Sequence, residues 1–147
     1  FQLEVPETVF LGRGAEYVHR ALAQLSEVGV KIALDDFGTG YASLRHLREF
    51  PVDIIKIDRS FVDRLDAPGG TSSGVVRTII ELSHDLGTTT VAEGIETGEQ
   101  LSALIDLSCD FGQGYYFSRP VPADEFATFI GRRATPPTGE GMSAVNG

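Results

Sequence analysis

Cysteine is almost absent from the 147-residue sequence, which contains a single one at Cys109. One cysteine excludes an internal disulfide, and its place in an apolar run indicates a small buried residue rather than a nucleophile. The histidines His19, His46 and His84 all fall in stretches with helical spacing, away from the ends of the strand-like runs. We interpret them as packing or surface residues, so metal chemistry based on thiolate or imidazole ligands is not expected.

Basic residues are also scarce. The chain has 12 Lys and Arg against 21 Asp and Glu, which gives a formal net charge of −9 and an isoelectric point near 4.7. This balance argues against nonspecific binding to DNA or RNA. A carboxylate-lined pocket can still accept a small phosphate ligand, provided that divalent cations reverse its sign.

Long apolar segments are missing as well. No stretch resembles a signal peptide or is long enough to span a membrane, so we expect a soluble cytoplasmic domain. The only methionine is Met142, which indicates that Phe1 is not a translation start. We therefore expect the chain to be part of a larger protein.

Polar side chains stand where five strand-like runs end. In the second run, Val30 to Leu34 is followed directly by Asp35 and Asp36. Adjacent carboxylates repel each other unless a cation lies beside them, although Asp35 could simply cap a turn and Asp36 could be solvated. Ligand sites of α/β proteins gather at the carboxyl ends of strands, so we expect a shared pocket. The other runs end in Glu4 and Glu7, in Lys56 and Asp58, in Glu93 and Glu96, and in Gln113.

Helical signals fill the intervals between these runs. The predicted helices lie around 18–28, over 43–50 before Pro51, from a capping-box pattern at 60–63, around 76–86, from a capping box at 97–100, and from Pro122 through Phe126, Phe129 and Ile130. Strands alternating with helices predict a parallel α/β sheet. A closed barrel of eight such units takes about 250 residues, so about five units predict a partial TIM-like (β/α) barrel over residues 1–131. Residues 132–147, rich in Pro and Gly, are predicted to be a disordered tail.

Four motifs carry a family resemblance. They are Asp35–Leu44 (DDFGTGYASL), Lys56–Val62 (KIDRSFV), Val91–Thr97 (VAEGIET) and Gln113–Pro120 (QGYYFSRP). In order and spacing they resemble the EAL-domain cyclic-di-GMP phosphodiesterases, from Phe1 to about Ile130. The resemblance covers the C-terminal half, or slightly more, of that family's barrel. The family's Glu-Ala-Leu segment and an asparagine metal ligand belong to the preceding portion, and Pro6 stands where the family usually has threonine.

The resemblance implies metal-dependent hydrolysis of cyclic-di-GMP to a linear dinucleotide, with two divalent ions that are usually Mg²⁺ or Mn²⁺. It implies metal ligands at Glu4, Asp35, Asp36 and Asp58, catalytic roles near the nucleophilic water for Lys56 and Glu93, and substrate or loop roles for Glu7, Phe37, Gly38, Thr39, Gly40, Glu96 and Gln113. Lys56 could equally form a salt bridge with Asp58 or Asp35, and both roles are compatible.

Two other functions stay open at this point. The chain could be a degenerate domain that binds cyclic-di-GMP or a protein partner without hydrolysis, or an interaction fragment whose exposed strand edges favour a homodimer. The expected partners are cyclic-di-GMP and the missing N-terminal half of the barrel. Without that half, the isolated chain is expected to be inactive.

Overall fold

The computed structural model describes residues 1–10, 14–38, 44–65, 72–122 and 143–144. All five strand-like runs form strands: β1 (Gln2–Pro6), β2 (Lys31–Phe37), β3 (Ile54–Ile57), β4 (Thr89–Ala92) and β5 (Phe111–Gly112). A sixth, β6 (Ser143–Ala144), pairs with β5 inside the stretch for which the sequence predicted no structure. Each strand is parallel to its neighbour, in the order β1-β2-β3-β4-β5-β6.

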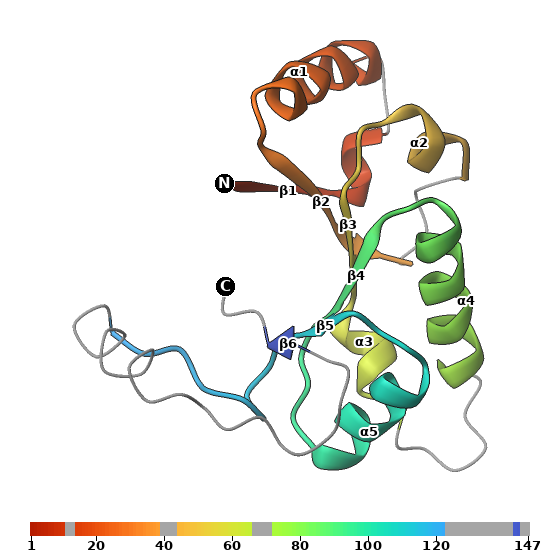
Figure 1. Cartoon of the computed structure of the whole chain (residues 1–147), viewed down its shortest axis with the longest axis vertical. Coiled ribbons are helices and arrows are strands. Elements are labelled where there is room, and N and C mark those ends of the chain that lie inside the picture. The colour runs from red at the N-terminus through yellow and green to blue at the C-terminus, as the bar shows by residue number, and fades with distance from the viewer. Residues whose placement is uncertain (11–13, 39–43, 66–71, 123–142, 145–147) are drawn as a thin grey trace.

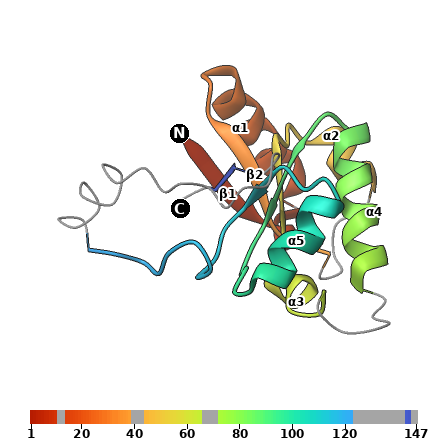
Figure 2. The same ribbon diagram turned by 60° about the horizontal axis from the view of Figure 1, so that its bottom comes forward.

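The helices lie along one side of this sheet (Figures 1 and 2). They are the 3₁₀ helix η1 (Glu7–Phe10), α1 (Ala15–Glu27), α2 (Leu44–Glu49), α3 (Arg59–Val62), α4 (Ser72–Asp85) and α5 (Gly98–Asp106). Each crossover adds the next strand on the same side of the previous one, so strands that are consecutive in the sequence are also neighbours in the sheet. The prediction of an α/β fold built from parallel βα units is confirmed, and the sheet is open, with β1 and β6 at its edges.

Two capping predictions had different outcomes. Thr97 and Gln100 form the predicted capping box of α5, with reciprocal side-chain to backbone bonds. The prediction that Ser60 opens a capping box was wrong. Asp58 caps α3 instead, because its Oδ1 accepts a hydrogen bond from the backbone N–H of Ser60 at 3.0 Å. The chain therefore turns into α3 directly at the end of β3.

Alternating side chains separate the two faces of the sheet. Ile32 and Leu34 of β2 are fully buried on the helix-covered side, whereas Asp35 belongs to the opposite face and is half-buried. Burial of one such aliphatic side chain contributes about 1.5–3 kcal/mol. The core also includes Ile55 and Ile57 of β3, Val76, Ile79 and Ile80 of α4, and Leu101 and Leu104 of α5.

The opposite face of the sheet forms a groove of about 730 Å³. Its lining runs from Lys31 and Asp53, near the amino ends of the strands, to Glu4, Lys56 and Gln113 near the carboxyl ends. At one edge of the sheet, β1 is exposed at every residue except Val5. These features fit a barrel wall of which only part is present, as the partial-barrel prediction requires.

Several sequence predictions lie outside the described residues. They include the helix expected after Pro122, the loop residues Thr39 and Gly40, and most of the tail expected to be disordered. Among the helices that are described, none is long and apolar enough to cross a membrane.

Candidate functional site

A buried lysine lies at the centre of the carboxyl-end cluster. Lys56 belongs to β3, and its side chain is only 7% exposed. Its Nζ atom lies 2.8 Å from Glu93 Oε1, 2.9 Å from Glu4 Oε2 and 3.0 Å from Asp35 Oδ1. The sequence allowed a salt bridge to Asp35 or Asp58, and the structure shows the one to Asp35. Carboxylates from β1, β2 and the end of β4 thus meet at one ammonium group.

The charges of this cluster are mutually dependent. Burial alone would lower the pKa of Lys56, but the adjacent carboxylates of Glu93, Glu4 and Asp35 raise it above its usual value. Burial raises the pKa of Glu93, and the Lys56 ammonium only partly offsets this effect. The Lys56 ammonium therefore offsets the mutual repulsion of the carboxylates around it.

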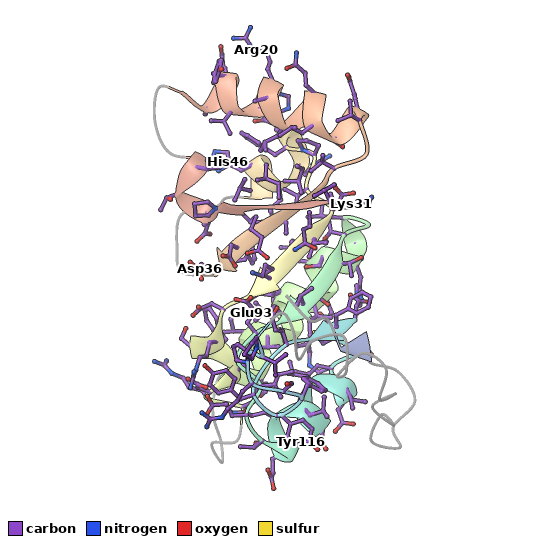
Figure 3. All side chains as sticks on the ribbon, turned by 90° about the vertical axis from the view of Figure 1, so that its left-hand side faces the viewer. Arg20, Lys31, Asp36, His46, Glu93 and Tyr116 are labelled. Carbon is purple, nitrogen blue, oxygen red and sulfur yellow. The ribbon has the colours of Figure 1, made fainter. Side chains whose placement is uncertain are left out.

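Asp35 and Asp36 point into the same site, which a regular strand would not allow. Successive side chains of a strand point to opposite faces. Here the β2–β3 register shifts between Leu34 and Phe37, and Asp36 has a left-handed φ of 55°. This irregularity brings carboxylate oxygens of Asp35, Asp36 and Glu93 within 4.8 Å of one another. Figure 3 shows Asp36 at the end of β2 opposite to Lys31.

Asp36 is the more exposed of the two neighbouring aspartates. Its pKa is raised by partial burial and by the negative charges of Asp35 and Asp58, against a smaller lowering by Lys56. A side-chain hydrogen bond with Asp58 raises it further. Asp58 is at the same time the N-cap of α3, so the cap holds this carboxylate beside Asp36.

The cluster fits a divalent cation. Asp35 Oδ1 is buried and, although close to Lys56, takes part in no hydrogen bond of good geometry with the described residues. A buried carboxylate oxygen in this state retains a lone pair for a further ligand. Oxygen donors alone, without thiolate or imidazole, are those that Mg²⁺ and Mn²⁺ prefer.

The remaining predicted site residues surround this cluster at different distances from it. Glu7 is buried in η1, and Phe37 is buried at the end of β2. Glu96 is turned away toward α3, where its Oε1 lies 2.8 Å from Arg59 Nη2. Gln113 lines the groove, and its backbone carbonyl accepts a hydrogen bond from the N–H of Ile95 at 3.0 Å.

Sequence reasoning gave no role to Arg59. Its guanidinium bridges Glu96 and Asp63, the latter through Nε at 3.2 Å. The available signal was its position directly after Asp58, at the end of a strand. A single sequence does not reveal which side chain reaches across to the next loop.

Comparisons of the sequence and of the structure with known proteins indicate the same protein family. The EAL domain model matches residues 1–120. Signaling protein YkoW of Bacillus subtilis is 37% identical over 129 residues, which are 88% of this chain and 16% of that protein. The solved structure of the PaMucR phosphodiesterase in complex with c-di-GMP is 40% identical with a TM-score of 0.78, over 85% of this chain and 50% of that chain.

A third relative contains metal. The manganese and cy-diGMP complex of Klebsiella pneumoniae BlrP1 is 37% identical with a TM-score of 0.72, over 81% of this chain and 30% of that chain. The chain therefore spans half or less of each of these relatives. The family match covers most of the chain, and the similarity of fold to the solved structures agrees with it. The chain belongs to the EAL domain family, of whose barrel it contains the C-terminal part.

Proposed function

We propose that this chain supplies the larger share of a two-cation phosphodiesterase site, which in the complete barrel hydrolyses cyclic-di-GMP to a linear dinucleotide. The observation that carries the proposal is buried Lys56 among the carboxylates of Glu4, Asp35 and Glu93. The names of the MucR and BlrP1 structures, which include this dinucleotide, support the substrate. Since the substrate is a bacterial second messenger, a cytoplasmic location is part of the same proposal.

The cation ligands in this proposal are carboxylates at the strand ends. Asp35 and Asp36 form the shared part of the site, with Glu4 on β1 and Asp58 at the cap of α3 as further ligands. Magnesium or manganese bound there would lower the pKa of bound water and offset charge on the phosphoryl oxygens.

Lys56 and Glu93 have the remaining chemical roles. Glu93 contacts Lys56 through one carboxylate oxygen and belongs to the carboxylate group that could hold a cation, so it can bind the cation or accept a hydrogen bond from the attacking water. Attack forms a new P–O bond and breaks one ester bond of the ring, and the sugar oxygen that leaves takes up a proton. The Lys56 ammonium offsets negative charge that develops on the phosphate in this step.

The rest of the barrel is a necessary partner in this proposal. β1 exposes its edge, and the chain matches only 50% of the MucR chain. We assign the uncovered edge and the groove to the N-terminal half of the domain, which would supply the remaining metal ligands. Open strand edges also allow a second copy of the chain to bind there.

The test is chromatography of cyclic-di-GMP incubated with the chain, with a separately expressed N-terminal half, and with both together. Magnesium- or manganese-dependent linear dinucleotide is expected only from the combination, and chelation of the metal should abolish it. Turnover by the chain alone would show that the missing strands carry no indispensable ligand. Binding of the dinucleotide by both halves without product would favour the degenerate function, and a stable homodimer that excludes the N-terminal half would overturn the assigned partner.

A further inference from the structure

The one-turn helix α3 contacts both loops that carry the cation-binding carboxylates. It begins directly after β3, with Asp58 as its cap, and Val62 anchors it in the core with no exposed surface. Because β3 is flanked by β2 and β4, α3 starts between the loops that follow these two strands. A rigid element in this place can fix the distance between them.

Phe61 of α3 covers the loop after Asp35 and Asp36. A methyl group on Gly38 would lie 2.8 Å from Cε2 and 3.0 Å from Cζ of the Phe61 ring, so the ring occupies the space that a side chain would need. Gly38 has a φ of 102°, and Asp36 two residues earlier also has a left-handed φ. For Asp36, which is not a glycine, such a conformation persists only where surrounding contacts enforce it. The Phe61 ring is one such contact.

Arg59 of α3 covers the loop after Glu93 in the same way. A methyl group on Gly94 would overlap Cγ of Arg59 and lie 2.8 Å from its Cβ, so the stem of the arginine packs against the backbone at Gly94. Gly94 also has a left-handed φ, of 72°. The guanidinium continues to Glu96 at 2.8 Å and to Asp63 at 3.2 Å. Arg59 thus spans the loop from Gly94 to Glu96 and ties it to α3.

We propose that Phe61 and Arg59 are positioning residues, which hold the Asp36–Gly38 and Glu93–Glu96 loops at the separation that cation binding requires. This inference rests on the cation site of the proposed function. The oxygens of Asp35, Asp36 and Glu93 lie within 4.8 Å of one another only because an irregular turn and a separate loop are both fixed. Loss of either contact lets one carboxylate move relative to the others.

The contacts are specific to the two loops rather than general packing. Val62, next to Phe61, is fully buried in the core, whereas Phe61 is only partly buried and its ring lies at Gly38. Val62→Ala should therefore lower stability without moving the carboxylates. Arg59→Lys keeps most of the stem over Gly94 and a positive charge for Glu96, so it should rescue what Arg59→Ala loses.

The experiment compares Phe61→Leu, Arg59→Ala, Arg59→Lys and Val62→Ala in the 147-residue chain. Amide hydrogen exchange, measured by NMR on the metal-free chain, monitors both loops. The amides of Phe37 and Gly38 report on the first loop, and those of Ile95 and Glu96 report on the second. Electron paramagnetic resonance of free Mn²⁺ gives the metal affinity, and urea unfolding gives the stability of each variant.

Phe61→Leu should accelerate exchange in the first loop and Arg59→Ala in the second, and each should weaken Mn²⁺ binding by about 10-fold or more. In Val62→Ala and Arg59→Lys, Mn²⁺ affinity should stay within about twofold of that of the parent chain. The rates of loop exchange in these variants, corrected for any change in global stability, should stay within about twofold as well. Unchanged loop exchange in Phe61→Leu and Arg59→Ala would overturn the positioning role, as would equal loss of affinity in Val62→Ala. If the parent chain binds no Mn²⁺ while the exchange results hold, the proposed cation site fails and the clamping of the loops stands.

Discussion

The two ends of the parallel sheet use carboxylates in opposite ways. At the amino ends, Asp53 and Asp110 each precede a strand and accept hydrogen bonds from the strand beside it. Asp53 Oδ2 accepts from the N–H of Ile32 at 2.9 Å, and Asp110 Oδ2 accepts from the N–H of Thr90 at 2.8 Å. Each also has a cationic or protonatable partner, Lys31 at 2.6 Å and His84 at 3.0 Å. Each of these two carboxylates therefore has its own hydrogen-bond donor and its own charge partner.

At the carboxyl ends, the carboxylates are crowded instead. Glu4, Asp35 and Glu93 share the single ammonium group of Lys56, and Asp36 lies against Asp58. Hydrogen bonds lower the pKa of Asp53 and Asp110 against the effect of burial, whereas burial and like charges raise the pKa of Asp36. The carboxylates at the amino ends stabilise the fold. Those at the carboxyl ends repel one another, and a bound cation can relieve this repulsion.

The largest expected effect is on stability and turnover, and it distinguishes Lys56 from Lys31, the other lysine of the chain. In Lys56→Met, the carboxylates of Glu4, Asp35 and Glu93 lose the buried cation that they share, so the free energy of unfolding without metal should fall by about 3 kcal/mol. Magnesium should restore part of this loss, because it replaces the missing charge. Turnover in the complete domain should be largely abolished, with metal binding retained. Urea unfolding with and without magnesium, together with turnover assays, measures these effects.

Lys31→Met is the matched control at the amino end. Lys31 is 64% exposed, and exposed ion pairs contribute little, so the loss should stay below about 1 kcal/mol, without rescue by magnesium. Equal losses in the two variants would remove the distinction between the ends. Loss of metal affinity in Lys56→Met would make Lys56 a structural partner of the carboxylates rather than a catalytic cation.

The next prediction compares two acids within the carboxyl ends. In the complete domain, Asp35→Asn should lower turnover by about 100-fold or more, because it removes a charged oxygen ligand. Glu96→Gln should cost about 10-fold or less, since Glu96 contacts Arg59 rather than the cluster. Rates of linear dinucleotide formation measure both. Comparable losses would contradict the assignment of direct and indirect roles.

The sequence predicted the fold well because its signals are local. Apolar runs of strand length, ended by acids and separated by amphipathic stretches, gave the five parallel strands and most of the helices that the structure describes. The cap of α3 was missed because Ser60 and Asp58 both suit that position, and only the backbone geometry decides between them. β6 was missed because a two-residue strand has no periodicity.

The site could be predicted only in part. Strand-end acids indicated which carboxylates meet, but not that Glu4 would approach Lys56, because this depends on the register between β1 and β3 across β2. The convergence of Asp35 and Asp36 depends on the irregularity after Leu34, which alternation rules do not anticipate. The contacts of Arg59 and Phe61 with glycines are tertiary and leave no signal in a single sequence.

At the amino ends, Asp110→Ala should lower the free energy of unfolding by about 2 kcal/mol, because the N–H of buried Thr90 then loses its acceptor. Mn²⁺ affinity should not change. Asp106→Ala, at an exposed position near the end of α5, is the control for loss of a nearby negative charge and should be neutral within about 0.5 kcal/mol. Urea unfolding and Mn²⁺ titration measure the two properties, and weakened metal binding in Asp110→Ala would show that the ends are not independent.

The smallest expected effect is the pH dependence of stability without metal. Asp53 and Asp110 have a lowered pKa in the folded chain, so they bind fewer protons when folded. Their contribution is complete above the unfolded pKa of about 4 and is lost as the pH falls through the folded pKa. Asp36 and Glu93 have a raised pKa, bind more protons when folded, and therefore contribute more as the pH falls from neutral toward about 4.

The free energy of unfolding should therefore rise slightly on acidification from pH 7 and fall again below about pH 4, by roughly 1 kcal/mol or less on each side. Asp36→Asn should flatten the rise and leave the fall, whereas Asp110→Asn should reduce the fall and leave the rise. Urea unfolding at intervals across this range, in chelator, measures both limbs. If one substitution altered both limbs equally, the two ends of the sheet would titrate as one coupled system, and their separation into a stabilising end and a cation-binding end would fail.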